Sequence, residues 1–137
     1  MHAYFDAKDG SPKVVIKIKG TSRKQKEIAA LLDTGHNGSL SLPILDLIEI
    51  GAKLSGFGPV GLADGNTITV LYFRLKVEID GTEKEVEASL IQNPNINEAI
   101  VGLELLAPYI ALIDFKSKSI RLLTEDEMKR AVKDKAK

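Results

Sequence analysis

The chain has 137 residues, in which 19 Lys and Arg balance 19 Asp and Glu, with two His and no Cys. Length and composition predict one ordinary globular domain, and the zero net charge excludes a broad basic surface for nucleic acid or an anionic membrane. The lack of Cys excludes disulfides, Cys-based zinc sites and thiol nucleophiles. The N-terminal residues lack the apolar segment of a secretory signal, and no apolar run approaches membrane-spanning length, so we expect a cytoplasmic protein.

Short strands with tight turns dominate the predicted elements. The segment Val14–Lys19 predicts a strand whose lysines turn to solvent. Residues 73–80 alternate strictly and meet residues 82–91 across Asp80-Gly81, a dipeptide that accepts the positive φ angles of a tight hairpin. Residues 109–115 and 119–123 predict a second hairpin. Strands this short and closely spaced predict a barrel or a sandwich.

Two short helices are predicted between the strands. Ser41 is predicted to cap a helix over Ile44–Ile50 that has Pro43 at its first position. Gly51 is predicted to end this helix, because Gly accepts the left-handed conformation common there. Residues 102–106 predict a second helical turn.

A third helix is predicted at the C-terminus. Thr124–Glu127 forms a capping box ahead of residues 128–135, and the acids in its first turn suit the helix dipole. Its apolar positions are few, so we expect a loosely docked segment. The predicted organisation is therefore an N-terminal segment of residues 1–13, a domain of residues 14–123 and a charged C-terminal helix of residues 124–137.

The most informative stretch is Ile28-Ala-Ala-Leu-Leu-Asp33-Thr34-Gly35-His36-Asn37-Gly38-Ser39-Leu40-Ser41-Leu42-Pro43. An apolar strand runs into Asp-Thr-Gly, which places the Asp33 carboxylate on a tight loop at the end of the strand. Thr34 adds a hydroxyl that can hydrogen-bond locally, and Gly35 lets another backbone come close. Taken alone, the tripeptide is more typical of an ordinary turn whose carboxylate caps backbone amides.

The wider sequence resembles the retropepsin-like aspartic proteases of the pepsin clan over about residues 14–123. The motifs of that family follow one another here in the family's order. They are Leu31-Leu32 before Asp-Thr-Gly, a flap tip at Leu62-Ala-Asp-Gly-Asn-Thr67, Ile100-Val101-Gly102 before a short helix, and a closing strand with Ile113-Asp114-Phe115. Residues 33–43 are especially similar to the small single-domain bacterial and archaeal members.

The resemblance implies an all-β acid-protease fold, a closed β-barrel with one or two short helices besides the C-terminal helix. It also implies an aspartic endopeptidase that needs no cofactor. In the family, two Asp-Thr-Gly loops face each other; one carboxylate activates a water and the other donates a proton to the scissile carbonyl. None of the other eight Asp here precedes Thr-Gly or Ser-Gly. The resemblance therefore implies a homodimer that contributes Asp33 from each subunit and binds an extended peptide or protein substrate.

Residue by residue, the resemblance makes Asp33 the catalytic carboxylate and Thr34 the hydroxyl that locks the two loops together. It places Gly35 against the substrate backbone. His36 either shapes the adjoining substrate pocket or shifts the proton affinity of the carboxylates, or is simply a partly exposed loop histidine. Asn37 stands where some relatives have an acid that binds the substrate backbone.

The remaining candidates lie outside that loop. Asp64 and Gly65 are either flap-tip residues that contact substrate or an ordinary hairpin turn, because that dipeptide suits both. Gly102 is predicted to pack under the active-site loop. Residues 56–61 predict a flexible bend leading into the flap.

Other chemistries and other roles were weighed against the protease. His2 and His36 are too few for a His-rich metal centre, so no metal is expected. A peptide-binding or dimerisation module with the same fold and little or no catalysis stays open. So does a regulated form in which residues 124–137 act as an inhibitory tail. The termini also differ from those of the viral members, which dimerise through interleaved end strands.

Overall fold

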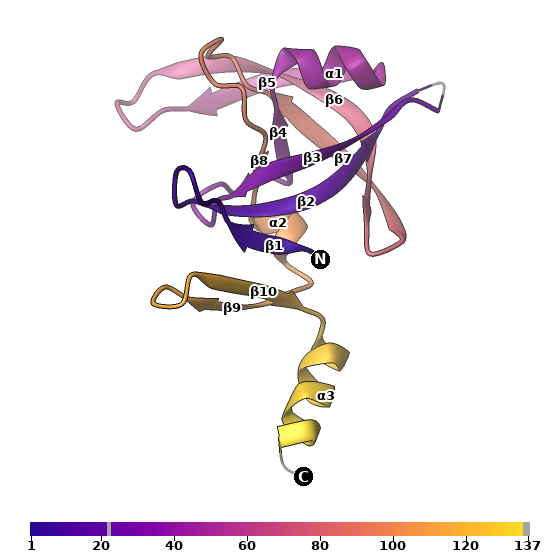
Figure 1. Cartoon of the computed structure of the whole chain (residues 1–137). Helices are drawn as coiled ribbons and strands as arrows, with labels where there is room; N and C mark the ends of the chain where they lie inside the picture. The colour runs from indigo at the N-terminus through magenta and orange to yellow at the C-terminus, as the bar shows by residue number, and fades with distance from the viewer. Residues whose placement is uncertain (22, 136–137) are drawn as a thin grey trace.

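The computed structural model describes residues 1–21 and 23–135 and contains mostly strands (Figure 1). The strands are β1 (Ala3–Phe5), β2 (Pro12–Lys19), β3 (Gln25–Leu32), β4 (Leu40–Leu42), β5 (Lys53–Gly61), β6 (Thr67–Ile79), β7 (Thr82–Leu90), β8 (Ile100–Val101), β9 (Ile110–Asp114) and β10 (Ser119–Leu123). The helices are α1 (Ile44–Ile50), α2 (Leu103–Leu106) and α3 (Glu125–Lys135). The all-β prediction with few short helices and a C-terminal helix is confirmed.

Eight of the strands form one curved sheet in the order β1-β2-β3-β8-β4-β7-β6-β5. An additional antiparallel pairing of β2 with β6 brings two distant parts of the sheet together, and the strands form a barrel-like ring (Figure 1). Two pairings are parallel, β3 with β8 and β4 with β7, and each joins segments far apart in the sequence. These parallel pairings bring the end of β3 next to β8 and α2.

The alternating segments bury one face each, as period-two patterns require. In β2, Val14, Ile16 and Ile18 are at most 1% exposed, and they pack into the core with Leu75 and Val77 of β6. The predicted β6–β7 hairpin is confirmed, with Ile79 opposite Thr82 across the turn. Strand β6 begins six residues earlier than the alternation suggested, because its first half pairs with β5.

Residues 56–61 are not a flexible bend, so that prediction was wrong. They form the second half of β5 and pair in antiparallel register with residues 67–72 of β6. A register shift between Leu54 and Gly56 marks a β-bulge. The pairing satisfies the backbone groups of this Gly-rich segment, and the ladder therefore overrides its low strand propensity.

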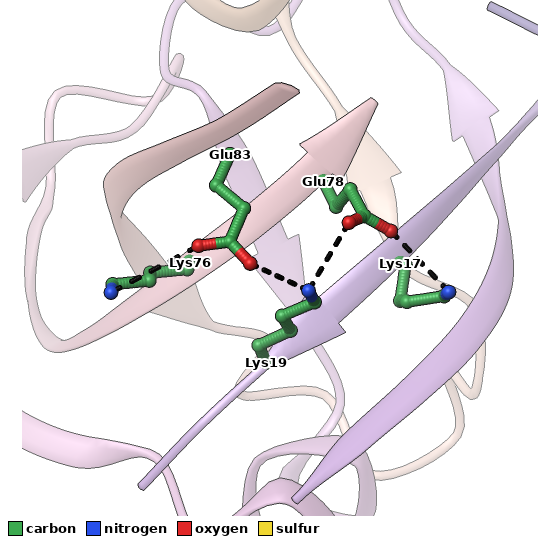
Figure 2. Close-up of polar contacts among 5 residues, drawn as sticks. All are labelled: Lys17, Lys19, Lys76, Glu78 and Glu83. Atoms are coloured by element: carbon green, nitrogen blue, oxygen red, sulfur yellow. Dashed lines mark hydrogen bonds and ion pairs between the residues drawn. The ribbon is translucent and has the colours of Figure 1, made fainter. Parts of the chain in front are cut away.

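The lysines of β2 were predicted to turn to solvent, but Lys17 and Lys19 are half-buried and paired with carboxylates. Lys19 lies between two carboxylates, 2.6 Å from Glu83 and 3.2 Å from Glu78, and Lys17 lies 3.3 Å from Glu78 (Figure 2). Lys76 reaches Glu83 from the other side at 4.0 Å. The hydrogen bonds to Glu83 and Glu78 raise the pKa of Lys19, and those from Lys19 lower the pKa of both glutamates. The side chains thus form an ion-pair row across β2, β6 and β7 where the ring closes.

The predicted bounds of α1 are confirmed, but its predicted cap is wrong. The helix spans Ile44–Ile50 and ends at Gly51 in the left-handed conformation. Pro43 is the residue before the helix, and no side chain caps its first turn. Ser41 belongs to β4 instead, where its hydroxyl faces other partners.

The last two helices follow the sequence prediction. Helix α2 begins after Gly102 as expected. In α3 the capping box is formed, since the Glu127 amide donates to the Thr124 hydroxyl at 3.2 Å and the Glu127 carboxylate accepts from the Thr124 amide at 3.2 Å. Within residues 1–21 and 23–135, no helix is long and apolar enough to span a membrane. The predicted division at residues 13 and 123 stays a prediction.

Candidate active site

The Asp33 loop, residues 33–39, leaves the end of β3 and leads into β4. Its first amide, that of Asp33, donates to the Val101 carbonyl at 3.0 Å and so continues the parallel β3–β8 ladder by one step. The Gly35 amide donates to the Asp33 carboxylate at 2.9 Å, and the His36 amide donates to the Asp33 carbonyl at 3.2 Å. Asp33 is half-buried, whereas Thr34 and Gly35 are exposed. The chain thus presents an oriented carboxylate at its surface.

Thr34 stands at the outer edge of this loop. Its hydroxyl has no hydrogen-bond partner among the residues that the structure describes. Gly35 follows with little room for a side chain, because an added Cβ would lie 3.2 Å from a carboxylate oxygen of Asp33. The loop can therefore approach another backbone closely at these two residues.

Gly102 lies directly beneath the Asp33 loop. A Cβ at this position would collide with the carbonyl oxygens of His36 and Gly38 and with the His36 ring. Its backbone φ is −108°, so the requirement for Gly here is space and not conformation. The amides of residues 102, 103 and 104 then donate to the carbonyls of Ser39 (3.0 Å), His36 (2.8 Å) and Gly38 (3.3 Å). The segment 101–104 is in this way a hydrogen-bonded base for the loop.

His36 lies over that base and is the first of three side chains, His36, Ser41 and Ser89, linked by hydrogen bonds into a short polar chain. Its Nε2 is 3.2 Å from the Ser41 hydroxyl, which in turn is 2.5 Å from the Ser89 hydroxyl of β7. Ser41 is only 6% exposed, so these contacts replace the water that its hydroxyl has lost. The chain links the Asp33 loop to β4 and β7 through side chains, in addition to the backbone bonds.

A groove of about 820 Å³ opens beside the Asp33 loop. Residues 35–40 form one wall, the outer strands β5, β6 and β7 supply most of the rest, and Gln92 after β7 and Glu104 of α2 complete it. Its lining combines aliphatic side chains with polar and acidic ones: Val60, Ile68, Val70, Tyr72, Lys84, Glu85, Val86, Glu87, Ser89, Leu90, Gln92 and Glu104. His36 and Asn37 line the groove, whereas Asp33 adjoins it through Gly35. An extended peptide is the kind of ligand that fits an open groove walled by strands.

The flap turn, residues 62–66, connects β5 to β6. The Leu62 amide donates to the Asn66 carbonyl at 2.7 Å, and Gly65 has a φ of +87°. The Asp64 carboxylate accepts from the Asn66 amide at 2.9 Å and from its side chain at 2.9 Å, which lowers the pKa of Asp64. Asp64 and Gly65 are exposed and do not line the groove. The structure therefore places His36 and Asn37 together with the Asp33 loop, but not Asp64 and Gly65.

No group of three or more His, Cys, Asp or Glu lies close enough to hold a metal ion within residues 1–21 and 23–135. His36 is engaged with Ser41, and His2 stacks against Tyr4 with ring centroids 5.6 Å apart. The absence of a metal site stays a prediction.

Comparisons with known proteins bear on the fold. No family model matches the sequence, and no curated protein matches it either. Among solved structures, the EIAV protease complexed with the inhibitor HBY-793 is similar over 74% of this chain and 90% of its own, with a TM-score of 0.52 and 16% identity. The chain has a retropepsin-like fold. At this identity the likeness to a retroviral protease establishes the fold alone.

Within the retropepsin-like fold, sequence reasoning missed three residues of the site. Ser41 was assigned to a helix cap, and Ser89 and Gln92 were not singled out. Ser89 meets Ser41 because β4 and β7 pair in parallel, and Gln92 donates through its side chain to the Thr69 carbonyl of β6. For Ser89 the only signal in the sequence was the alternation of β7, which turns it to the face opposite Ala88. For Gln92 there was no such signal.

Proposed function

We propose that the chain is an aspartic endopeptidase whose active site forms between two copies of the chain. One observation carries the proposal: the single Asp-Thr-Gly loop is presented at the surface, on a hydrogen-bonded base and beside a strand-walled groove. This loop belongs to a retropepsin-like fold. One copy supplies one carboxylate, so the reaction needs a second.

The proposed chemistry follows from two Asp33 side chains close together. Two like charges at such a distance cannot both ionise, so the pair holds one proton. The ionised carboxylate takes a proton from a water that attacks the scissile carbonyl carbon, and the protonated one donates to the carbonyl oxygen, which gives a tetrahedral diol. The carboxyl group that took the water's proton then passes it to the peptide nitrogen, the C–N bond breaks, and the other carboxylate recovers its proton as the new carboxyl group forms. The Gly35 amide, 2.9 Å from the Asp33 carboxylate, fixes the orientation of each carboxylate. Thr34, exposed beside it, is proposed to lock one loop to the other.

The groove indicates the class of substrate. Val60, Ile68 and Val70 from the flap strands make its apolar wall, which favours apolar side chains near the scissile bond. His36 and Asn37 are proposed to contact the substrate from the Asp33 loop. Glu104 adds a carboxylate at the loop side of the groove. We therefore propose an extended peptide or protein segment as substrate, with no metal or cofactor.

Two further parts of the proposal rest on sequence. The motif of residues 33–43 supports a place among small single-domain bacterial and archaeal members of the family. The lack of Cys fits a cytoplasmic location.

The test is cleavage of a diverse peptide library, followed by mass spectrometry from acidic to neutral pH. The wild type is compared with Asp33→Asn, and Asp64→Asn is the matched control because both carboxylates accept an amide two residues on. We expect cleavage by the wild type and the control, and none by Asp33→Asn. The oligomeric state is measured in the same buffers. A wild-type dimer that binds peptides without cleaving them would overturn the protease and support a peptide-binding module.

A further inference from the structure

A second pocket, of about 530 Å³, is lined by the connection between β2 and β3 and by strands β5, β6 and β7. We call it the basic pocket. Among the residues that the structure describes, two carboxylates, those of Glu83 and Glu85, line it together with five cations: Lys19, Arg23, Lys53, Arg74 and Lys76. The whole chain has no net charge, so this excess of positive charge is a local feature.

Two pairs of like charges stand opposite one another in the sheet around the basic pocket. Lys19 of β2 is in register with Lys76 of β6, and Lys53 of β5 is in register with Arg74 of β6. Like charges directly opposite on neighbouring strands destabilise a sheet, because their side chains lie close together on the same face. Such departures from the rules of stable sheets are expected mainly where a protein binds something. The two pairs therefore indicate a site for an anionic ligand.

Carboxylates of β7 offset only part of this repulsion. Glu83 lies between the two lysines of the first pair, 2.6 Å from Lys19 and 4.0 Å from Lys76 (Figure 2). In the second pair, Arg74 reaches another carboxylate of β7 at 3.3 Å. Its neighbour Lys53 is exposed and forms no ion pair among residues 1–21 and 23–135. The pocket can therefore accept further negative charge beside Lys53.

The basic pocket continues the groove beside the Asp33 loop along one face of β6. Alternate residues of a strand point to the same face. On this face, residues 68, 70 and 72 line the groove, and residues 74 and 76 line the basic pocket. Glu85 of β7 lines both. From Val70 to Lys76 the strand rises roughly 20 Å, which an extended peptide also covers in about six residues.

We propose that the basic pocket binds acidic side chains of the substrate, on one side of the apolar segment that occupies the groove. This inference rests on the proposed function, because it adds a second contact for the same peptide or protein substrate. The substrate class is then an extended apolar segment with Asp or Glu roughly six residues from the side chain that contacts Val70. Two weak contacts in one chain give an affinity well above that of either contact alone.

An acidic peptide fits this pocket better than a nucleic acid does. Nucleic acids are held by cations along the phosphate backbone, and single strands also stack on aromatic rings. Among the described residues, no aromatic side chain lines the basic pocket, whereas Glu83 and Glu85 do. A few carboxylates can approach Lys53 alone, but a phosphate backbone that follows the pocket must pass both glutamates.

The test measures the binding of fluorescent peptides by anisotropy at neutral pH and physiological salt. One peptide joins an apolar segment to a run of Glu through an uncharged spacer, and its counterpart carries Gln in place of Glu. Both are made with the run at either end. The protein variants are Lys53→Glu and, as the matched control, Lys8→Glu in the turn before β2. Both lysines are exposed, and neither forms an ion pair among residues 1–21 and 23–135.

We expect the wild type to bind the Glu peptide about tenfold more tightly than the Gln peptide, for one placement of the run. Lys53→Glu should abolish this difference, and Lys8→Glu should keep it. Where the Glu peptide is cleaved, Lys53→Glu should raise its KM and leave kcat unchanged, because Lys53 does not line the groove. The thermal unfolding midpoint of Lys53→Glu should not fall, because an opposite-charge pair with Arg74 replaces a like-charge pair.

Three results would overturn the inference. The first is equal binding of the Glu and Gln peptides by the wild type. The second is an equal loss of binding in Lys53→Glu and Lys8→Glu, since net charge alone would then explain it. The third is tighter binding of a single-stranded RNA with the same charge, because the ligand would then be a nucleic acid. A Glu run that binds equally well without the apolar segment overturns the link between the pocket and the groove.

The outcomes also separate this inference from the proposed function. Peptide cleavage that depends on Asp33, without any preference for Glu, overturns the basic pocket as a substrate site and leaves the protease intact. Binding of the Glu peptide that depends on Lys53, without cleavage of any peptide, supports the pocket and counts against the protease.

Discussion

In the Asp33 loop, the Asp33 carboxylate accepts the amide of Gly35 at 2.9 Å; in the flap turn, the Asp64 carboxylate accepts the amide of Asn66 at 2.9 Å. Both are Asx turns, and each contains a Gly within two residues of the Asp. The flap turn is held by bonds among residues 62–66. The Asp33 loop is held by bonds to residues 101–104, by Gly102 beneath it and by the Ser41–Ser89 pair.

The difference teaches that the local motif makes only the turn, and its surroundings decide whether the turn can serve as a site. A carboxylate that must meet a reacting atom needs a fixed position, which the Asp33 loop obtains from tertiary bonds. A turn at the tip of a hairpin can move with its strands, which suits a segment that covers a groove.

The largest effect is expected from Gly102→Ala. The methyl group collides with the His36 and Gly38 carbonyls, so the Asp33 loop must shift. We expect a loss of about 1–3 kcal/mol in the free energy of unfolding and of roughly 100-fold in peptide cleavage. The control is Gly61→Ala near the flap turn, where an added Cβ meets nothing within 4 Å. Unchanged stability and activity in Gly102→Ala would show that close packing of residues 101–104 under the Asp33 loop is not needed to hold the loop.

Ser41→Ala tests the side-chain part of the same support. It leaves the half-buried Ser89 hydroxyl and the His36 ring without their shared partner. We expect a loss of about 1–3 kcal/mol, measured by urea unfolding. Ser55→Ala, at an exposed strand position, is the control and should change stability by less than about 0.5 kcal/mol. Equal effects of the two would show that the polar chain contributes nothing.

Gly65→Val examines the flap turn, where the requirement is conformational. A β-branched side chain at a φ of +87° is strained, so we expect a loss of about 1–2 kcal/mol in thermal unfolding. Gly65→Asn is the matched variant, because Asn adopts left-handed conformations much more readily, and it should lose less. A Val variant as stable as the Asn variant contradicts the left-handed turn.

The smallest effect is expected from titration of Asp64. The backbone and side-chain hydrogen bonds from Asn66 lower its pKa from 3.8. Because the pKa is lower in the folded state, the support that the carboxylate gives the turn is present above pH ~4 and is lost as pH falls through the lowered pKa. The Asn66 amide should therefore lose its protection against hydrogen exchange as the pH falls through the lowered pKa of Asp64. The measured rates are first corrected for the intrinsic exchange rate of an unprotected amide at each pH. Asp64→Asn should show no such pH step.

Helices and hairpins could be predicted from local signals in the sequence. The surroundings of the site could not, because they depend on pairings between distant segments. Asp80-Gly81 located the β6–β7 hairpin, and Gly51 located the end of α1, because both depend on neighbouring residues alone. Ser41 was misassigned because its strand forms by pairing with Ser89 and Ile100, which no local pattern records. The resemblance singled out Asp33 and Gly102. The collision geometry that makes Gly102 necessary appears only when residues 36–38 lie on it.

The base beneath the Asp33 loop also sets an order of events during synthesis. The loop emerges from the ribosome well before residues 101–104, whose backbone holds it in place. Contacts between segments so far apart in the chain form slowly and late in folding. Under the proposed function this delay is a safeguard, because the growing chain carries the Asp33 carboxylate on an unsupported loop until most of the barrel has been made.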